Sequence, residues 1–193
     1  MVMKIDRKGL CLLLGAILLA LALAGMLLWQ WQICDAREKA EGYVTALRQL
    51  TPQAQGAMPE ARSNNTMPVL SLEGVDFAGI LEMPRFGSAL PVGAKWGKIS
   101  SYPCCYFGSV YDGTLQLGAT TQEGQYDFYR EICVGDMVYF TDLEGNRYGY
   151  TVTAMRYAQH AAQTALQREE ADLTLFVKNV YAFEYLIIFC NAM

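Results

Sequence analysis

An unbroken apolar run near the N-terminus constrains this chain more than any other feature. It extends from Leu10 to Trp29 and contains no charged residue. As a helix rising about 1.5 Å per residue, a run of about 20 residues spans about 30 Å, the thickness of the hydrocarbon core of a bilayer. The sequence therefore predicts one transmembrane helix at residues 9–31, with Trp29 and Trp31 at the membrane interface.

The charges beside the run predict its orientation. Lys4, Arg7 and Lys8 precede it against one acid, Asp6, whereas acidic and basic residues are mixed after it. Because positively charged flanks stay in the cytoplasm, we expect a cytoplasmic tail at residues 1–8. The rest of the protein is then extracytoplasmic, held at the cell membrane by a single pass.

A cleaved signal peptide is the alternative interpretation of the same run. Ala20-Leu21-Ala22 and Ala22-Leu23-Ala24 match small-residue cleavage sites. However, the apolar run continues to Trp29, which is longer than the ~7–15 apolar residues of a signal peptide. The pattern favours an uncleaved anchor.

Charge and cysteine content exclude several classes of function. A net charge of −4 leaves no basic face to neutralise phosphates, so nucleic acid is not expected as a partner. Six cysteines occur without C-x-x-C spacing, and no acidic cluster is visible, so neither a metal nor an organic cofactor is expected. How the cysteines pair cannot be derived from their spacing. A peptide or protein partner fits this composition best.

The segment after the apolar run, residues 32–68, is expected to have two parts. Asp35–Leu50 is rich in helix formers, contains no Pro, and places apolar residues on one face, which predicts a juxtamembrane helix. Thr51–Pro68 is rich in Pro, Gln, Asn and Ser and predicts a flexible stalk. Residues 69–193 then form the globular domain.

From Val69 onward, short runs of β-branched and aromatic residues are broken by Gly, Pro and Asp. Glu144-Gly145-Asn146 predicts a tight hairpin, and Glu123–Glu131 and Gln159–Glu170 favour short helices. Many short strands with few helices predict a closed or nearly closed β-barrel, or a sandwich. The predicted strands are Asp76–Glu82, Leu115–Gly118, Asp136–Thr141, Tyr148–Met155, Leu173–Val177 and Tyr185–Phe189.

Several motifs in this region follow one another in the order of a known family. They are Gly79–Pro84 with Leu90-Pro91-Val92, then Pro103–Ser109, then Val134–Asp142 with Gly145-Asn146 and Tyr150-Thr151-Val152, and finally Asp172–Phe176. Together, behind an anchor and a stalk, they resemble the sortases, the membrane-anchored cysteine transpeptidases of Gram-positive bacteria. The resemblance extends from Gly79 to Cys190 and implies an eight-stranded β-barrel with short helices.

The resemblance also implies a chemistry. Active sortases attack a sorting-signal peptide with a Cys thiolate, a His transfers protons, and an Arg steadies the oxyanion or the substrate. These residue types are needed because a thiol must be partly ionised to attack and the leaving amine must receive a proton.

At the three family positions this sequence carries other residues. In Gly118-Ala119-Thr120, Ala119 stands where the family has His. In Leu173–Lys178, Lys178 stands where it has Cys, and Tyr185 stands where many members have Arg. Cys190 matches a further family Cys, so the register is kept across this region. The resemblance therefore predicts a pseudoenzyme without cofactors, which binds a peptide, a surface protein or a pilus-assembly partner.

Other residues support an alternative, an active transpeptidase or hydrolase with a rearranged site. His160 is the single histidine and lies in a segment that borders the substrate groove in sortases. Cys104 and Cys105 are candidate relocated nucleophiles, and a buried Lys178 can act as a nucleophile or base. The ordinary interpretation is that His160 is solvated, that both cysteines are structural, and that Lys178 is a solvated cation.

Overall fold

The computed structural model describes residues 7–52, 65–97, 102–120, 129, 131–159, 171–179 and 184–193. The chain divides into two compact units, residues 1–36 and residues 37–193. One helix, α1 (Arg7–Leu50), begins in the first unit and ends in the second. The other described elements belong to the second unit, the barrel unit.

The N-terminal unit is an apolar helix whose large side chains are exposed, among them Leu12, Leu18 and Trp31. Within the described residues it is the one helix long and apolar enough to cross a membrane. A helix of this kind at the N-terminus serves as a membrane anchor or a signal sequence. The expected apolar helix is confirmed, and the orientation stays a prediction.

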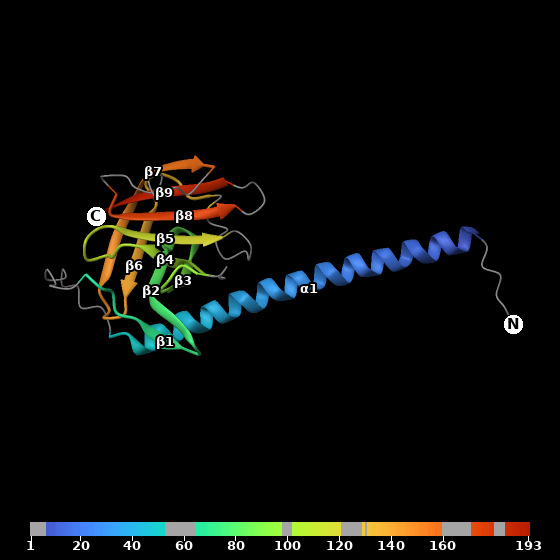
Figure 1. Ribbon diagram of the computed structural model, residues 1–193, viewed down its shortest axis with the longest axis horizontal. Coiled ribbons are helices and arrows are strands. Elements are labelled where there is room, and N and C mark those ends of the chain that lie inside the picture. Colours follow the sequence, from blue (N-terminus) through green and yellow to red (C-terminus); the bar gives the residue numbers. More distant parts are fainter. Residues whose placement is uncertain are drawn as a thin grey trace. The chain divides into compact units, whose positions relative to one another are not determined.

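Nine strands form one mixed sheet in the described part of the barrel unit (Figure 1). Between β2 and β3 lies a short 3₁₀ helix, η1 (Pro84–Phe86). The strands are β1 (Leu70–Leu72), β2 (Val75–Met83), β3 (Ser88–Gly93), β4 (Cys104–Phe107), β5 (Leu115–Thr120), β6 (Met137–Asp142), β7 (Arg147–Ala158), β8 (Leu173–Asn179) and β9 (Glu184–Ala192).

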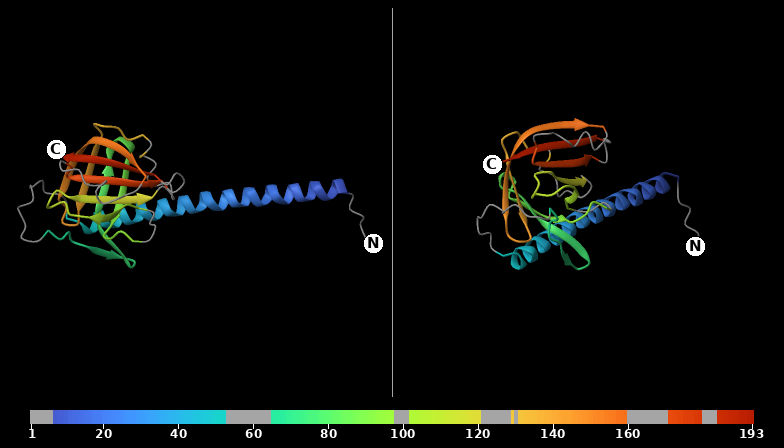
Figure 2. Two further views of the ribbon diagram at one scale, coloured as in Figure 1. Left: turned by 45° about the horizontal axis from the view of Figure 1, so that its top comes forward. Right: turned by 60° about the vertical axis from the view of Figure 1, so that its left-hand side comes forward.

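The sheet closes on itself as an eight-stranded barrel (Figure 2). Around the barrel the order is β2-β3-β4-β5-β8-β9-β7-β6, and β6 pairs with β2 again. The short β1 pairs only with the first residues of β2 and lies outside this ring. Two pairings are parallel, β3 with β4 and β5 with β8, and the rest are antiparallel. The predicted fold class is therefore confirmed.

Each of the six predicted strands lies within or overlaps an observed strand, and β1, β3 and β4 were not among them. The hairpin between β6 and β7 is confirmed, with Gly145 at a φ of 86° and its N–H donating to the Asp142 carbonyl at 3.2 Å. The predicted helix at Gln159–Glu170 lies outside the described residues, apart from Gln159. So does most of the predicted helix at Glu123–Glu131.

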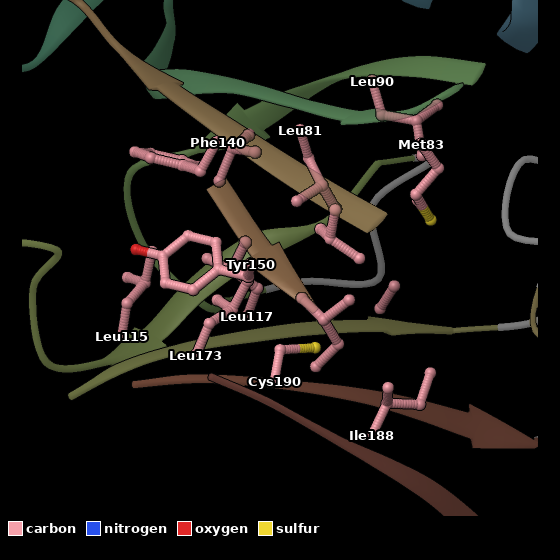
Figure 3. Close-up of a cluster of buried hydrophobic side chains, with 14 of the residues drawn as sticks. Leu81, Met83, Leu90, Leu115, Leu117, Phe140, Tyr150, Leu173, Ile188 and Cys190 are labelled. Carbon is pink, nitrogen blue, oxygen red and sulfur yellow. The ribbon is translucent and has the colours of Figure 1, made fainter. Parts of the chain in front are cut away.

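The barrel interior is filled by side chains that alternate with outward-facing ones along each strand. Leu81, Leu117, Phe140 and Leu175 are fully buried there, as Figure 3 shows for several members of the cluster. On β8 the outward-facing Phe176 is buried as well, because it belongs to a second cluster with Ile187 and Phe189. β8 is therefore covered on both faces.

The last turns of α1 pack against the outside of the barrel unit. Val44 and Leu47 are buried together with Phe77 and Ile80 of β2. Arg48 adds an ion pair with Glu82 at 2.6 Å. The predicted helix at Asp35–Leu50 is thus part of α1. Of the predicted stalk, residues 53–64 lie outside the described residues.

Truncation of Leu47 is expected to weaken the docking of this helix on β2. Leu47 is fully buried, so Leu47→Ala removes apolar contacts and leaves a cavity, at a cost of about 2 kcal/mol in the free energy of unfolding. Leu50→Ala is the matched control, because Leu50 is 60% exposed on the same helix. Urea unfolding of the full chain in detergent measures both, and equal effects would contradict the packing.

Candidate functional site

The strand register brings the ends of β5, β8 and β9 together. Thr120 on β5 pairs with Lys178 on β8, and Lys178 pairs with Tyr185 on β9. Ala119 pairs with Val177, one step further from the strand end. The three positions that the resemblance singled out therefore lie on three neighbouring strands.

These three side chains do not share a face. Ala119 belongs to the interior cluster, together with Leu117 and Val177. Tyr185 packs against the outer cluster that contains Phe176. Because side chains alternate along a strand, Lys178 lies on the same outer face as Phe176. The structure thus places an amine and a phenol side by side on the outer face, while the methyl group of Ala119 points into the barrel.

Aromatic rings cover the outer face of the sheet next to Lys178. The Phe176 ring centroid lies 5.3 Å from that of Trp96 and 5.2 Å from that of Tyr106. The Tyr185 ring centroid lies 6.4 Å from that of Phe176. Offset and edge-to-face contacts of this kind stabilise aromatic clusters. No pattern in the sequence indicates Trp96, because its contact with Phe176 depends on the three-dimensional path of the chain.

Gly118 allows these rings to lie close to β5. A Cβ atom at this position would collide with the rings of Phe176 and Trp96. Two polar oxygens flank Gly118 along β5, Oε1 of Gln116 and Oγ1 of Thr120. Both atoms are buried, and neither has a hydrogen-bond partner among the described residues. The outer face of β5 therefore carries two hydrogen-bond acceptors without a described partner, next to the rings of Phe176 and Trp96.

Two of the three buried cysteines are poor nucleophiles. Cys105 and Cys190 lie in the interior cluster. Burial raises the pKa of the Cys190 thiol to about 12, and burial together with the neighbouring Cys104 raises the pKa of Cys105 to about 12. Since the thiolate is the attacking species, these thiols are almost fully protonated at neutral pH.

The other predicted site residues are placed as follows. Cys104 is buried, and its Sγ lies 3.7 Å from the Tyr102 carbonyl oxygen. His160 lies outside the described residues. The chain enters that segment from Ala158, which pairs with Tyr185. No disulfide joins any of the six cysteines, all of which lie in the described part of the chain.

Metal binding has no candidate in this part of the chain. Among the described residues, no three His, Cys, Asp or Glu side chains gather as a metal ion would need. The site that the structure does offer consists of strand ends, aromatic rings and one lysine. Such a surface can bind a ligand by contact area and by charge.

The buried thiols predict that stability falls at high pH. Their folded pKa of about 12 exceeds the ordinary value of 9.0, so unfolding releases protons between these two values. The contribution is present below about pH 9 and is lost as pH rises toward 12. Each thiol should lower the free energy of unfolding by about 2 kcal/mol between pH 8 and pH 10.5.

Cys190→Ala is the variant that checks this pH dependence. Urea unfolding at both pH values should show a smaller fall in stability for Cys190→Ala than for the wild type. An identical fall in both proteins would mean that the Cys190 thiol is not held protonated by burial.

Comparison with known proteins agrees with this architecture. The chain is similar to sortase A from Corynebacterium diphtheriae, with a TM-score of 0.53 and 14% identity over 89% of this chain and 95% of that one. It is similar to sortase C1 from Streptococcus agalactiae, with a TM-score of 0.54 and 16% identity over 64% and 70% of the two chains. Sortase C from Clostridium perfringens gives a TM-score of 0.51 and 16% identity over 84% and 89%.

No protein-family model matches the chain, and no curated protein matches it in sequence. At such low identities the structural similarity shows the fold. The chain is a sortase-like eight-stranded mixed β-barrel preceded by a long apolar helix.

Proposed function

We propose that this chain is a membrane-anchored, sortase-like pseudoenzyme that binds a peptide, a surface protein or a pilus-assembly partner outside the cell without cleaving it. In this proposal residues 9–31 anchor the protein with its N-terminus in the cytoplasm. Residues 69–193 form the extracytoplasmic domain.

The pairing of Lys178 with Thr120 and Tyr185 is the observation that carries the proposal. In the sortase-like register this strand end would have to present a thiol next to a guanidinium. An amine and a phenol stand there instead. Loss of one member of such a constellation costs several orders of magnitude in rate.

No described residue around this strand end replaces the missing catalytic groups. The methyl group of Ala119 faces the barrel interior and cannot transfer a proton. Cys105 and Cys190 are buried in the same interior and have raised pKa values. The barrel frame is nevertheless complete, with half-exposed aromatic rings on its outer face, and this supports a role in binding.

A cleavage assay tests the absence of catalysis. The full chain in detergent is incubated with a sorting-signal peptide that carries a fluorophore and a quencher, with and without an amine acceptor. We expect no cleavage above the buffer rate. Cleavage that disappears in His160→Ala or in Cys104→Ala would establish the rearranged active site and would refute the pseudoenzyme.

A further inference from the structure

A groove of about 750 Å³ lies beside β4, on the side away from β5. Its lining includes residues 105–108 of β4 and the turn that follows, residues 94–96 after β3, and the extended segment at residues 65–67. Its volume falls within the range of about 300–1,000 Å³ that is usual for ligand sites. Lys178 and Tyr185 do not line it.

Large apolar side chains on the groove wall are exposed. Val69 is 53% exposed, Phe107 47%, Tyr106 38% and Trp96 37%, and all four line the groove. Apolar side chains gathered in one concave surface are typical of a binding site, whereas isolated ones are not. The groove therefore favours a ligand with apolar groups.

Within the described ranges, the last residues of β4 have no partner strand on the edge that faces the groove. β4 pairs with β3 at a single position, Cys104 with Gly93. On the same side the Gly93 N–H donates to the Pro103 carbonyl at 2.8 Å, and the Trp96 N–H donates to the Cys105 carbonyl at 2.7 Å. Beyond Cys105, no strand within the described ranges pairs with β4 on that side. An open strand edge beside an apolar groove is the arrangement to which extended peptides add as a further strand.

Two charged residues in the groove lining, Lys95 and Asp76, bear on which peptides the groove can bind. Lys95 is exposed and has no ion pair or side-chain hydrogen bond within the part of the chain that the structure describes. The other charged residue in the lining, Asp76, accepts a hydrogen bond from the Ser71 hydroxyl. That hydrogen bond occupies the Asp76 carboxylate but leaves its charge, so Lys95 is the cation of the described lining that complements a carboxylate on the ligand.

We propose that an extended peptide segment of a partner protein adds to the free edge of β4, packs apolar side chains against Val69 and Phe107, and pairs a carboxylate with Lys95. This site rests on the proposed peptide-binding function and gives it a location and a ligand chemistry. The bound peptide also contacts Trp96 and Tyr106, whose rings cover Phe176 two residues before Lys178.

Dye-labelled synthetic peptides test the site on the full chain in detergent micelles, with empty micelles subtracted. Each peptide has about seven residues, a length of roughly 23 Å when extended, with Val, Leu or Phe at alternate positions. One pool ends in Glu and a matched pool ends in Lys, and both have an amidated C-terminus. Fluorescence anisotropy should show about two- to fivefold tighter binding of the Glu pool.

Three variants complete the test. Phe107→Asp should weaken binding of the Glu pool by about tenfold, because it places a charge in the apolar wall. Lys95→Glu should reverse the preference, so that the Lys pool binds more tightly. Tyr157→Asp is the matched control, since Tyr157 is 72% exposed on β7 and does not line the groove, and it should bind like the wild type.

The possible failures are distinguishable. Peptide binding that is unchanged in both Phe107→Asp and Lys95→Glu would refute the groove and leave the proposed peptide-binding function standing. No binding of either pool to the wild type would refute the ligand chemistry, whereas the absence of catalysis is judged by the cleavage assay. A dimer that Phe107→Asp converts to a monomer without peptide would assign the groove to a second copy of the chain.

Discussion

Replacement of Asp142 by alanine should lower the free energy of unfolding by about 3–5 kcal/mol. Asp142 is 1% exposed. Its carboxylate accepts hydrogen bonds from the backbone N–H groups of Glu144 and Asn146 at 2.9 Å, and from the Asn146 amide at 2.9 Å. The hydroxyls of Tyr111 and Tyr148 donate to it at 3.1 and 3.3 Å. Alanine would leave all these donors without their acceptor.

Asp112→Ala is the matched control for this variant. Asp112 also caps a turn through its carboxylate, accepting from the N–H of Ser109 at 3.3 Å and of Thr114 at 3.1 Å, but it is exposed. Water can replace it there, so we expect a loss of only about 1 kcal/mol. Thermal and urea unfolding of both variants compare the two sites. Similar losses in the free energy of unfolding would contradict the expectation that burial makes the hydrogen bonds of Asp142 more important for stability than those of Asp112.

A cysteine at position 178 should react with a thiol reagent about a thousand times faster than Cys105 or Cys190 at neutral pH. Lys178 is only partly buried, at the end of β8. A thiol with an ordinary pKa is a few per cent ionised there, whereas a thiol with a pKa of about 12 is ionised about a thousandfold less. Time-resolved labelling of Lys178→Cys, with each site identified by peptide mass, measures the rates separately.

The same variant should not cleave a sorting-signal peptide. In the described residues no imidazole lies near position 178, and Ala119 on the neighbouring strand points into the interior. A thiol alone lacks the proton transfer that expulsion of an amine needs. Slow labelling at position 178 would mean that this strand end is covered. Cleavage by the variant would mean that a proton-transfer group lies within reach.

The strands that the sequence predicts are those with a strong pattern. β6 is rich in β-branched and aromatic residues, which marks it as a strand from residue type, and its buried positions Val138, Phe140 and Asp142 alternate. β3 contains Pro91, and proline is disfavoured inside strands because it lacks a backbone N–H. β1 has only three residues, too few for a pattern, and β4 places two adjacent cysteines in buried positions and so does not alternate. They are defined by backbone pairing, of β1 and β3 with β2 and of β4 with β5, which residue type alone does not reveal.

The predicted helix boundaries also differ from those in the structure. The sequence predicts a transmembrane helix and a separate juxtamembrane helix, whereas α1 is continuous from Arg7 to Leu50. The stretch between Trp29 and Asp35 contains neither Pro nor Gly, so nothing interrupts the backbone hydrogen bonds. The amino-acid composition changes there from apolar to charged, but the helix continues through the change.

The candidate site was predictable in position and not in orientation. The motifs place Ala119, Lys178 and Tyr185 on neighbouring strands, as the register has them. Which face each residue takes depends on where the strand begins, and a shift of one residue reverses it. Of the groove beside β4, the sequence indicates the dense aromatic residues that include Tyr106 and Phe107, whereas Val69 and Trp96 join them only through folding.

A pseudoenzyme of this kind has no cysteine that acts as an activated nucleophile. Intact mass measurement of the wild-type full chain, after incubation with a thiol-reactive peptide that mimics a sorting signal, tests this directly. We expect only slow labelling, at Cys34 and Cys133, the exposed cysteines outside the apolar run, and the same rate for a scrambled peptide. Rapid labelling of one cysteine to one equivalent, dependent on the peptide sequence, would contradict it.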